Sequence, residues 1–298
     1  MLVLATGFGI MSFTSKEAVN LPTKPLYLNR NCLMNFLSTD TALRICLKQR
    51  KLLSNPRPFV LVTAMPKSAS TFLHRVLMNL TGFGTAYFAS AYGNIEQELY
   101  RPRLIDSYDA ATVTQQHVRA NHPNLKLMEQ FRIRPVVLVR NVHDIIISMR
   151  DHLLNERLDN LPGLYVPEEF PEFDTGLQLD FVVTYAAPWL ISFYYSWLMA
   201  EKSGRLDVLW LNYEVIVADW PAALKRVLRY YDIEKSDAEI ETALSDLAQK
   251  KKSQLRLNKG ISGRGAEELS AEQRQQIYRM TLAYPGIDFS AVGIDTDY

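Results

Sequence analysis

The segment from Pro66 to Thr71 gathers side chains that suit the binding of a phosphate-like anion. Lys67 carries a mobile positive charge, and Ser68, Ser70 and Thr71 add hydroxyl donors. A loop between a buried strand and a helix also presents backbone N–H groups and the positive end of the helix dipole. A capped helix alone needs only one Ser or Thr, so the segment predicts an anion site rather than a simple cap.

This loop differs from the Walker A motif of ordinary ATP and GTP kinases. That motif, Gly-x4-Gly-Lys-Ser/Thr, requires glycines at positions 61 and 66, where the sequence has Leu61 and Pro66. An ordinary kinase is therefore disfavoured. A small-molecule kinase with an atypical phosphate loop stays an alternative.

A second basic segment lies near the C-terminal end of the chain. No acidic residue occurs between Asp246 and Glu267. The whole chain has 33 Lys and Arg against 32 Asp and Glu, a net charge of +1, so any anion site must be local. The segment contains Lys250, Lys251, Lys252, Arg256, Lys259 and Arg264, interleaved with Gly260, Gly263 and Gly265.

The residues from Ala64 to Phe72 resemble the Pro-Lys-Ser-Gly-Thr-Thr-Trp loop of the sulfotransferases that use 3′-phosphoadenosine 5′-phosphosulfate (PAPS). In that family the loop grips the 5′-phosphosulfate. This sequence has Ala69 for Gly, Ser70 for Thr and Phe72 for Trp. We expect Ala69 to have φ below zero and Phe72 to offer adenine a smaller aromatic face. The resemblance implies donor contacts by Lys67, Ser68, Ala69, Ser70, Thr71 and Phe72.

Arg140 and Ser148 resemble the second phosphate motif of that family, an Arg at a strand end followed eight residues later by a Ser. The resemblance implies that both residues contact the 3′-phosphate of the donor. An Arg at a strand end suits a bidentate phosphate contact. Taken alone, Arg140 could instead pair with Asp144, and Ser148 could be an ordinary hydroxyl inside a helix.

Two weaker resemblances concern the rest of the donor site. Residues 259–263, Lys-Gly-Ile-Ser-Gly, are similar to the Arg-Lys-Gly-x-x-Gly segment of the family, although Asn258 stands where Arg is usual. This implies that Lys259 and Gly260 close over the 3′-phosphate. Tyr213 precedes a Glu after a predicted strand, as in the family, which implies a place near the adenine. A buried Tyr at a strand end is the other interpretation.

Sulfuryl transfer needs a positive charge near the leaving phosphate oxygen and a base for the acceptor hydroxyl. Lys67 is the candidate for the first role. The base of the family is a His on a strand between the two phosphate motifs, which implies His117. His122 is the alternative, followed by Glu129 or no side-chain base. Gln115 stands where many family members have Lys.

Three apolar stretches, residues 59–64, 135–139 and 206–212, predict buried strands, each followed by a helix. We predict these helices over residues 70–80, 144–154 and 220–231. The alternation predicts a three-layer α/β/α fold with a central parallel sheet, and the resemblance implies the P-loop NTPase-like architecture of sulfotransferases. We expect one domain over residues 1–298. It includes an N-terminal extension, residues 1–57, with a helix over 39–53, and an irregular lid or acceptor insertion at 155–188.

The composition limits the class of protein further. Two cysteines, Cys32 and Cys46, are too few for a disulfide framework in 298 residues and indicate a reducing, cytoplasmic compartment. The sequence predicts no membrane span, because no apolar stretch reaches the roughly 20 residues required. No nucleic-acid partner and no metal are expected, and the oligomeric state is left open.

Together these features predict a PAPS-dependent sulfotransferase that acts on a hydroxyl of a small-molecule acceptor. Trp189, Phe193 and Trp197 recur every four residues on a probable helix and form either core or the acceptor pocket. Besides the atypical kinase, the sequence allows a protein that binds PAPS or its spent form without catalysis.

Overall fold

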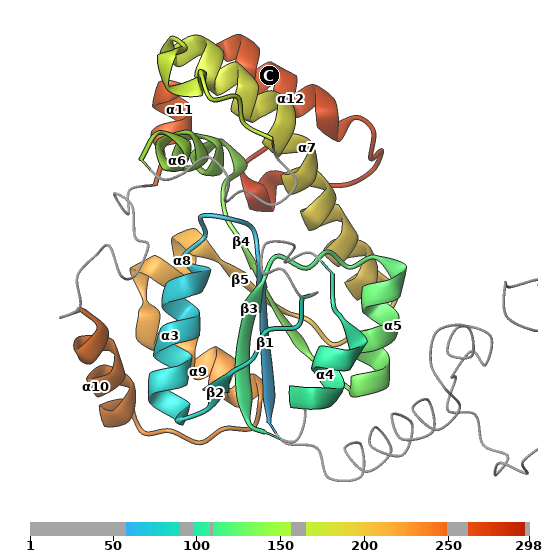
Figure 1. The fold of residues 1–298 in the computed structure, drawn as a ribbon, viewed down its shortest axis with the longest axis vertical. Helices are drawn as coiled ribbons and strands as arrows, with labels where there is room; N and C mark the ends of the chain where they lie inside the picture. Colours follow the sequence, from blue (N-terminus) through green and yellow to red (C-terminus); the bar gives the residue numbers. More distant parts are fainter. Residues whose placement is uncertain (1–57, 90–97, 108–109, 156–164, 249–261, 296–298) are drawn as a thin grey trace, which may run out of the picture. The chain divides into compact units, whose positions relative to one another are not determined.

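The computed structural model describes residues 58–89, 98–107, 110–155, 165–248 and 262–295. All of them belong to one compact unit, Lys48–Tyr298. Five parallel strands form a single sheet in the order β2-β3-β1-β4-β5 (Figure 1). The strands are β1 (Phe59–Ala64), β2 (Gly84–Thr85), β3 (Thr112–Gln116), β4 (Pro135–Val139) and β5 (Leu209–Asn212).

Helices cover both faces of this sheet, so the predicted three-layer α/β arrangement is confirmed. Helices α3, α8, α9 and α10 lie on one side and α4 and α5 on the other, while α6, α7, α11 and α12 gather beyond the carboxyl ends of the strands (Figure 1). Within the described ranges, no helix has both the length and the apolar character needed to cross a bilayer. The bounds are α3 (Ser70–Thr81), α4 (Arg101–Ser107), α5 (His122–Phe131), α6 (Val142–Asn155), α7 (Thr175–Lys202), α8 (Tyr213–Ala218), α9 (Trp220–Tyr230), α10 (Asp237–Ala248), α11 (Arg264–Glu268) and α12 (Ala271–Thr281), with short 3-10 turns η2 (Phe170–Glu172) and η4 (Ser290–Val292).

Strand β1 lies at the centre of the sheet. All six of its residues are buried, and it pairs with β3 on one side and β4 on the other. Val60, Val62 and Ala64 face one apolar cluster that includes side chains of α3, α8, α9 and α10. A strand buried on both faces must be apolar almost throughout, as this sequence is.

Strand β3 was not predicted as a strand from its sequence, Thr-Val-Thr-Gln-Gln, because four of its five residues are polar. The structure buries three of them, Thr112, Thr114 and Gln116, and pairs the side chains of the last two with backbone groups. The Thr114 hydroxyl donates to the Ala86 carbonyl at 2.6 Å, and the Gln116 side-chain oxygen accepts from the Phe88 N–H at 3.0 Å. These bonds offset the cost of burying polar groups.

Two expectations about element boundaries need correction. The third strand begins at Leu209 rather than residue 206. The segment 155–188 is not irregular throughout, because the 28-residue helix α7 starts at Thr175 and contains Pro188. Asp174 caps this helix by accepting from the Leu177 N–H at 2.9 Å. Residues 156–164 and the predicted helix at 39–53 lie outside the described residues.

The backbone of the phosphate loop also differs from expectation. Ala69 has φ of 64° and Lys67 has φ of 63°, so both lie in the left-handed region. The prediction that Ala69 has φ below zero was wrong. Ala69 is the residue before α3 and accepts a hydrogen bond from the Leu73 N–H at 3.0 Å, so the loop keeps the conformation that a glycine would adopt despite the strain on the Cβ atom.

Replacing Ala69 with Gly should therefore stabilise the protein. We expect Ala69→Gly to raise the free energy of unfolding by about 1 kcal/mol, because a left-handed conformation costs an alanine roughly that much. Urea unfolding followed by circular dichroism measures the change. Ala186→Gly, inside α7, is the control and should destabilise by about 1 kcal/mol. Equal losses in both variants would contradict the strain at Ala69.

Candidate active site

The loop between β1 and α3 presents its polar groups at the carboxyl edge of the sheet. Ser68 is buried, and its hydroxyl donates to the Met65 carbonyl at 2.5 Å, which fixes the turn. No side chain in the described structure caps α3, so the N–H groups of its first turn remain directed toward the loop. Ser70 is buried and Thr71 is half-buried beside them. This arrangement suits an anion at the helix start.

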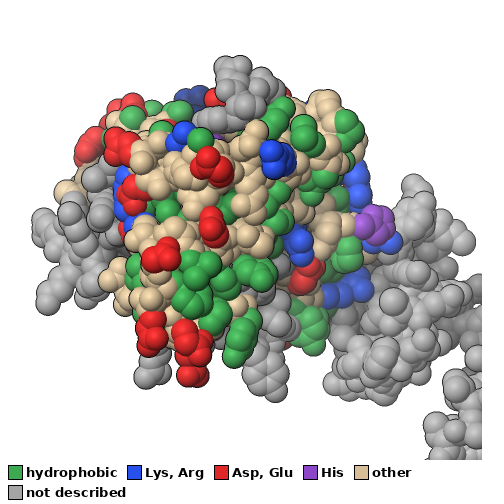
Figure 2. All heavy atoms as spheres, turned by 90° about the horizontal axis from the view of Figure 1, so that it is seen from above, with side chains coloured by type: hydrophobic (Ala, Val, Ile, Leu, Met, Phe, Trp, Pro, Cys, Tyr) green, Lys and Arg blue, Asp and Glu red, His purple; other side chains and the backbone are tan. Residues whose placement is uncertain are grey.

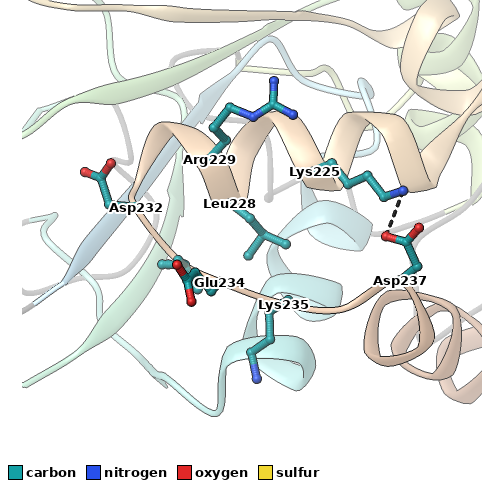
Figure 3. Close-up of a pocket in the computed structure, with 8 residues that line it drawn as sticks. Lys225, Leu228, Arg229, Asp232, Glu234, Lys235 and Asp237 are labelled. Atoms are coloured by element: carbon teal, nitrogen blue, oxygen red, sulfur yellow. Dashed lines mark ion pairs between the residues drawn. The ribbon is translucent and has the colours of Figure 1, made fainter.

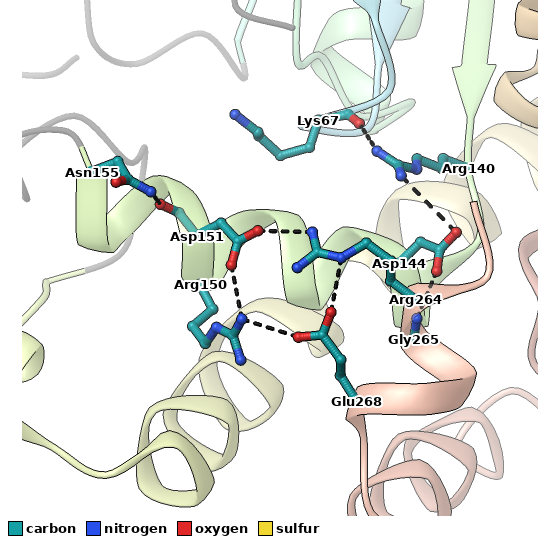
Figure 4. Close-up of polar contacts among 9 residues, drawn as sticks. All are labelled: Lys67, Arg140, Asp144, Arg150, Asp151, Asn155, Arg264, Gly265 and Glu268. Carbon is teal, nitrogen blue, oxygen red and sulfur yellow. Dashed lines mark hydrogen bonds and ion pairs between the residues drawn. The ribbon is translucent and has the colours of Figure 1, made fainter. Parts of the chain in front are cut away.

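Arg140 joins the second predicted motif to this loop. It follows β4 directly, is only 6% exposed, and donates from Nη1 to the Lys67 carbonyl at 2.6 Å (Figure 4). Its guanidinium lies 4.0 Å from the centre of the Tyr213 ring. The ion pair to Asp144 is long, at 4.0 Å. Arg140 is therefore oriented mainly by the loop and by an aromatic face.

His117 reaches the same loop from the neighbouring strand. It follows β3 and is half-buried, and its Nδ1 lies 2.7 Å from the Ala64 carbonyl oxygen. Because a carbonyl can only accept, Nδ1 carries the proton, and Nε2 is the basic nitrogen of the neutral ring. The ring edge of Trp189 lies against His117, with centroids 6.5 Å apart. The contact with the Ala64 carbonyl thus holds the His117 ring next to the phosphate loop.

The other predicted bases are placed less favourably. His122 is the exposed first residue of α5. The Glu129 carboxylate forms an ion pair with Arg205 at 2.6 Å. Gln115 lies half-buried on β3, directly before the buried Gln116. Of these candidates, His117 is the one whose ring is bonded to the end of β1, next to the phosphate loop.

The other residues predicted to bind the PAPS donor lie in three different settings. Ser148 is buried on α6, and Tyr213 is buried as the first residue of α8 beneath Arg140. Phe72 is 8% exposed and packs against Trp220, with ring centroids 4.4 Å apart. Trp220 therefore covers most of the Phe72 ring, a contact that the sequence did not predict. Lys259 and Gly260 lie outside the described residues.

Sequence reasoning missed the contacts that dock the C-terminal segment against α6. The Asp144 carboxylate accepts from the backbone N–H groups of Gly263 and Gly265, each at 2.8 Å. The Asp144 N–H in turn donates to the Asn141 side-chain oxygen at 3.2 Å. A signal existed in the glycines, because position 265 tolerates no larger residue. A Cβ atom there would lie 2.4 Å from the His143 Cβ.

A ring of charges surrounds this docking contact (Figure 4). Arg264 contacts Asp151 at 2.7 Å and Glu268 at 2.8 Å, and Arg150 contacts Asp151 at 2.8 Å and Glu268 at 3.1 Å. Both arginines and Asp151 are largely covered by protein, so these contacts are less screened than ordinary surface pairs. Arg264 is thus a docking residue for α11, and its charge is already balanced by two carboxylates.

The aromatic stripe of α7 divides between the two interpretations. Phe193 and Trp197 are buried core residues, and the Trp197 indole N–H donates to the Val118 carbonyl at 2.9 Å. Trp189 is half-buried and lies beside His117. Figure 2, which looks onto the helices at this end, shows apolar side chains interspersed with acidic and basic ones. Leu177 and Tyr185 of α7 are exposed.

Two other observations concern the described residues away from the anion site. Within the described ranges, no three His, Cys, Asp or Glu residues form a group able to hold a metal ion. A depression of about 500 Å³ beside the end of α9 is lined by charged residues such as Arg229 and Glu234 (Figure 3). Its Lys225 pairs with Asp237 at 2.8 Å. The adjoining Tyr231 donates to the Arg134 carbonyl at 2.5 Å, which places this region at the amino end of β4.

The family model of the sulfotransferase domain matches residues 57–280. The chain belongs to the sulfotransferase family. The match covers both phosphate motifs, His117 and the C-terminal segment, so the predicted resemblance is confirmed at the level of the family. No curated protein matches this sulfotransferase by sequence.

Solved structures have a similar fold. The mouse sulfotransferase SULT7A1, complexed with PAP, has a TM-score of 0.56 and 15% identity, and the alignment covers 76% of this chain and 83% of that one. A retinol dehydratase in a complex with retinol and PAP has a TM-score of 0.48 and 14% identity, with coverage of 80% and 85%. The first likeness supports the fold of this sulfotransferase.

The close approach at Gly265 gives a test of the docking contact in this sulfotransferase. We expect Gly265→Ala to lower the free energy of unfolding by about 3 kcal/mol, because the new Cβ meets backbone atoms of α6 that cannot move aside. Chemical unfolding measures the change. Glu267→Ala, an exposed change on the same helix, should cost less than about 0.5 kcal/mol. A similar small effect at Gly265 would contradict the described packing of α11 on α6.

Proposed function

We propose that this protein transfers a sulfuryl group from PAPS to a hydroxyl group of a small-molecule acceptor. One observation carries the proposal. Two carbonyls three residues apart, that of Ala64 at the end of β1 and that of Lys67 in the following loop, accept hydrogen bonds from the candidate base and the candidate 3′-phosphate residue, His117 at 2.7 Å and Arg140 at 2.6 Å. A base and two anion-binding elements are therefore fixed to one short segment, as a reaction between a phosphosulfate and a hydroxyl requires.

The donor would lie along the carboxyl edge of the sheet. The N–H groups at the start of α3, with the hydroxyls of Ser70 and Thr71, would bind the 5′-phosphosulfate, while the Ser68 hydroxyl, which donates to the Met65 carbonyl, would hold the turn. Arg140 and Ser148 would bind the 3′-phosphate, with Arg140 supported by the Tyr213 ring. This use of Tyr213 differs from direct adenine binding, but both are compatible with its place at the end of β5.

The proposed chemistry is an in-line displacement at sulfur. The acceptor oxygen forms a bond to sulfur while the bond from sulfur to the 5′-phosphate oxygen breaks. His117 Nε2 takes the proton of the hydroxyl, and the positive charge of Lys67 stabilises the negative charge that develops on the departing phosphate. The products are a sulfate ester and adenosine 3′,5′-bisphosphate (PAP). The step needs no redox partner, and we propose it without a metal.

The acceptor class rests on the surroundings of His117. Trp189 lies against the ring of the base, so an acceptor that reaches Nε2 passes an aromatic surface, which favours a small molecule with apolar parts. The exposed acids Glu168, Glu169 and Glu172 near the start of α7 disfavour a polyanionic acceptor. A cytoplasmic location stays a prediction that rests on the low cysteine count.

PAP binding is the first test of the donor site. We expect PAP to raise the melting temperature of the protein in a concentration-dependent way, because a ligand that binds the native state stabilises it by mass action. Thermal unfolding with increasing PAP measures the shift. Lys67→Ala should reduce it, because the lysine charge contributes to phosphate binding. No shift at millimolar PAP would contradict the proposed donor site.

Turnover tests the assignment of the base. We expect His117→Ala to lower kcat by about 100-fold or more in an assay of labelled sulfate transfer from PAPS to phenolic and alcoholic acceptors, while PAP still shifts the melting temperature. His122→Ala is the matched control and should stay close to wild type, since His122 is exposed on α5.

The same assay separates the alternatives. Loss of activity in His122→Ala with normal activity in His117→Ala would transfer the role of base to His122. Turnover that requires ATP and Mg²⁺ would support the atypical kinase. PAP binding without transfer to any acceptor would support a binding protein that lacks catalysis.

A further inference from the structure

The position of Asp144 in the site is not explained by an ion pair with Arg140. Asp144 is 3% exposed and lies in the first turn of α6, four residues after Arg140, the proposed 3′-phosphate residue that precedes this helix. Opposite charges this near in sequence could form a close ion pair. Here the nearest oxygen is 4.0 Å from Arg140 Nη2, beyond the 2.7–2.9 Å expected for a charge-assisted hydrogen bond.

The two carboxylate oxygens are directed instead to the C-terminal segment. Oδ1 accepts from the Gly265 N–H and Oδ2 from the Gly263 N–H, both at 2.8 Å. Figure 4 shows Asp144 between Arg140 and the start of α11, so that one side chain faces both. These two bonds hold the carboxylate to the C-terminal segment, and it stays 4.0 Å from the guanidinium of Arg140, which donates to the Lys67 carbonyl.

Groups from the β1–α3 loop and from α8 complete the surroundings of Arg140. The Lys67 carbonyl binds Nη1, and the Tyr213 ring covers the guanidinium plane. Glu214 of α8 accepts from the Asn141 N–H at 3.1 Å, which holds the residue next to Arg140. Burial lowers the pKa of the adjacent His143, and the nearby Arg274 lowers it further, so that His143 adds no positive charge at neutral pH.

We propose that Asp144 is a positioning residue of the 3′-phosphate site. It docks residues 263–265 against α6 beside Arg140, and so holds the C-terminal segment at the 3′-phosphate site without contacting the donor itself. The inference rests on the proposed function and adds to it a residue that the phosphate motifs do not include. In this role, a single carboxylate connects the C-terminal segment to the second phosphate motif.

The direction in which a mutation of Asp144 changes 3′-phosphate binding distinguishes two possible effects of its carboxylate. A carboxylate this close to Arg140 repels a bound phosphate, so removing its charge without any other effect should strengthen 3′-phosphate binding. The positioning role predicts the opposite. In Asp144→Asn the amide oxygen can accept one N–H, but the amide nitrogen faces the other N–H and cannot accept it, so residues 263–265 lose part of their anchor.

The experiment compares PAP with adenosine 5′-monophosphate (AMP), which lacks only the 3′-phosphate. Calorimetry on the full chain gives both dissociation constants, and the ratio of the AMP constant to the PAP constant isolates the 3′-phosphate contribution. We expect Asp144→Asn to lower this ratio about tenfold, the effect of losing one hydrogen bond to a charged group, while AMP affinity stays close to wild type. Unchanged AMP affinity also reports that the variant is folded.

Asp151→Asn is the matched control. It removes a carboxylate from the same helix and breaks the contacts to Arg264 and Arg150, but it leaves the two glycine amides on Asp144. We expect it to lower the melting temperature and to keep the ratio. Asp144→Ser, which places no amide donor against the glycines, is the second variant should Asp144→Asn fail to fold, and it should lower the ratio as well.

The outcomes separate the inference from the proposed function. A ratio near one in the wild type would overturn both, because no 3′-phosphate site would exist. A high ratio in the wild type that is unchanged or raised by the Asp144 variants would overturn the positioning role and leave the donor site intact. An equal fall in the Asp151 control would also overturn it, because general loosening of α11 would explain the effect.

Discussion

The hydrogen bond from Arg140 to the Lys67 carbonyl is the interaction on which the active site depends. It joins two strand-loop-helix units across the sheet, at 2.6 Å and with the cation buried. A buried charge is costly unless it is paired and bonded. Here the backbone carbonyl, the Tyr213 ring and the longer contact to Asp144 share that task. The same bond holds Lys67 in a left-handed conformation that a lysine would otherwise avoid.

The fold was predictable wherever the burial pattern follows the chain. The apolar stretches of β1 and β4 are buried on both faces, and their β-branched residues indicate strands directly. Strand β3 was not predictable in this way. Its buried Thr114 and Gln116 side chains bond to backbone groups of Ala86 and Phe88, and no local sequence pattern reveals these partners. The first half of helix α7 was hidden for a related reason, since Pro188 lies within a helix whose stability comes from tertiary burial.

The site was predictable in its motifs and less so in its connections. Lys67 and Arg140 were placed by the order and spacing of the motifs, and the structure brings them into contact. The backbone of Ala69 was mispredicted, because residue preference yields to the geometry that the loop must adopt between β1 and α3. The partners of Asp144 lie 119 and 121 residues away in sequence, and Phe72 packs on Trp220, which is still more distant along the chain. Such pairs are set by the assembled fold and leave no local signal.

The parallel sheet has a consequence for how this protein is made. Its central strand leaves the ribosome before both neighbours with which it pairs, with His117 and Ala64 separated by 53 residues and Arg140 and Lys67 by 73. Until those partners are synthesised, both edges of β1 present unpaired backbone groups and an apolar surface. Folding of such a topology is slow and depends on distant contacts. The nascent chain is therefore most prone to aggregation before β4 emerges.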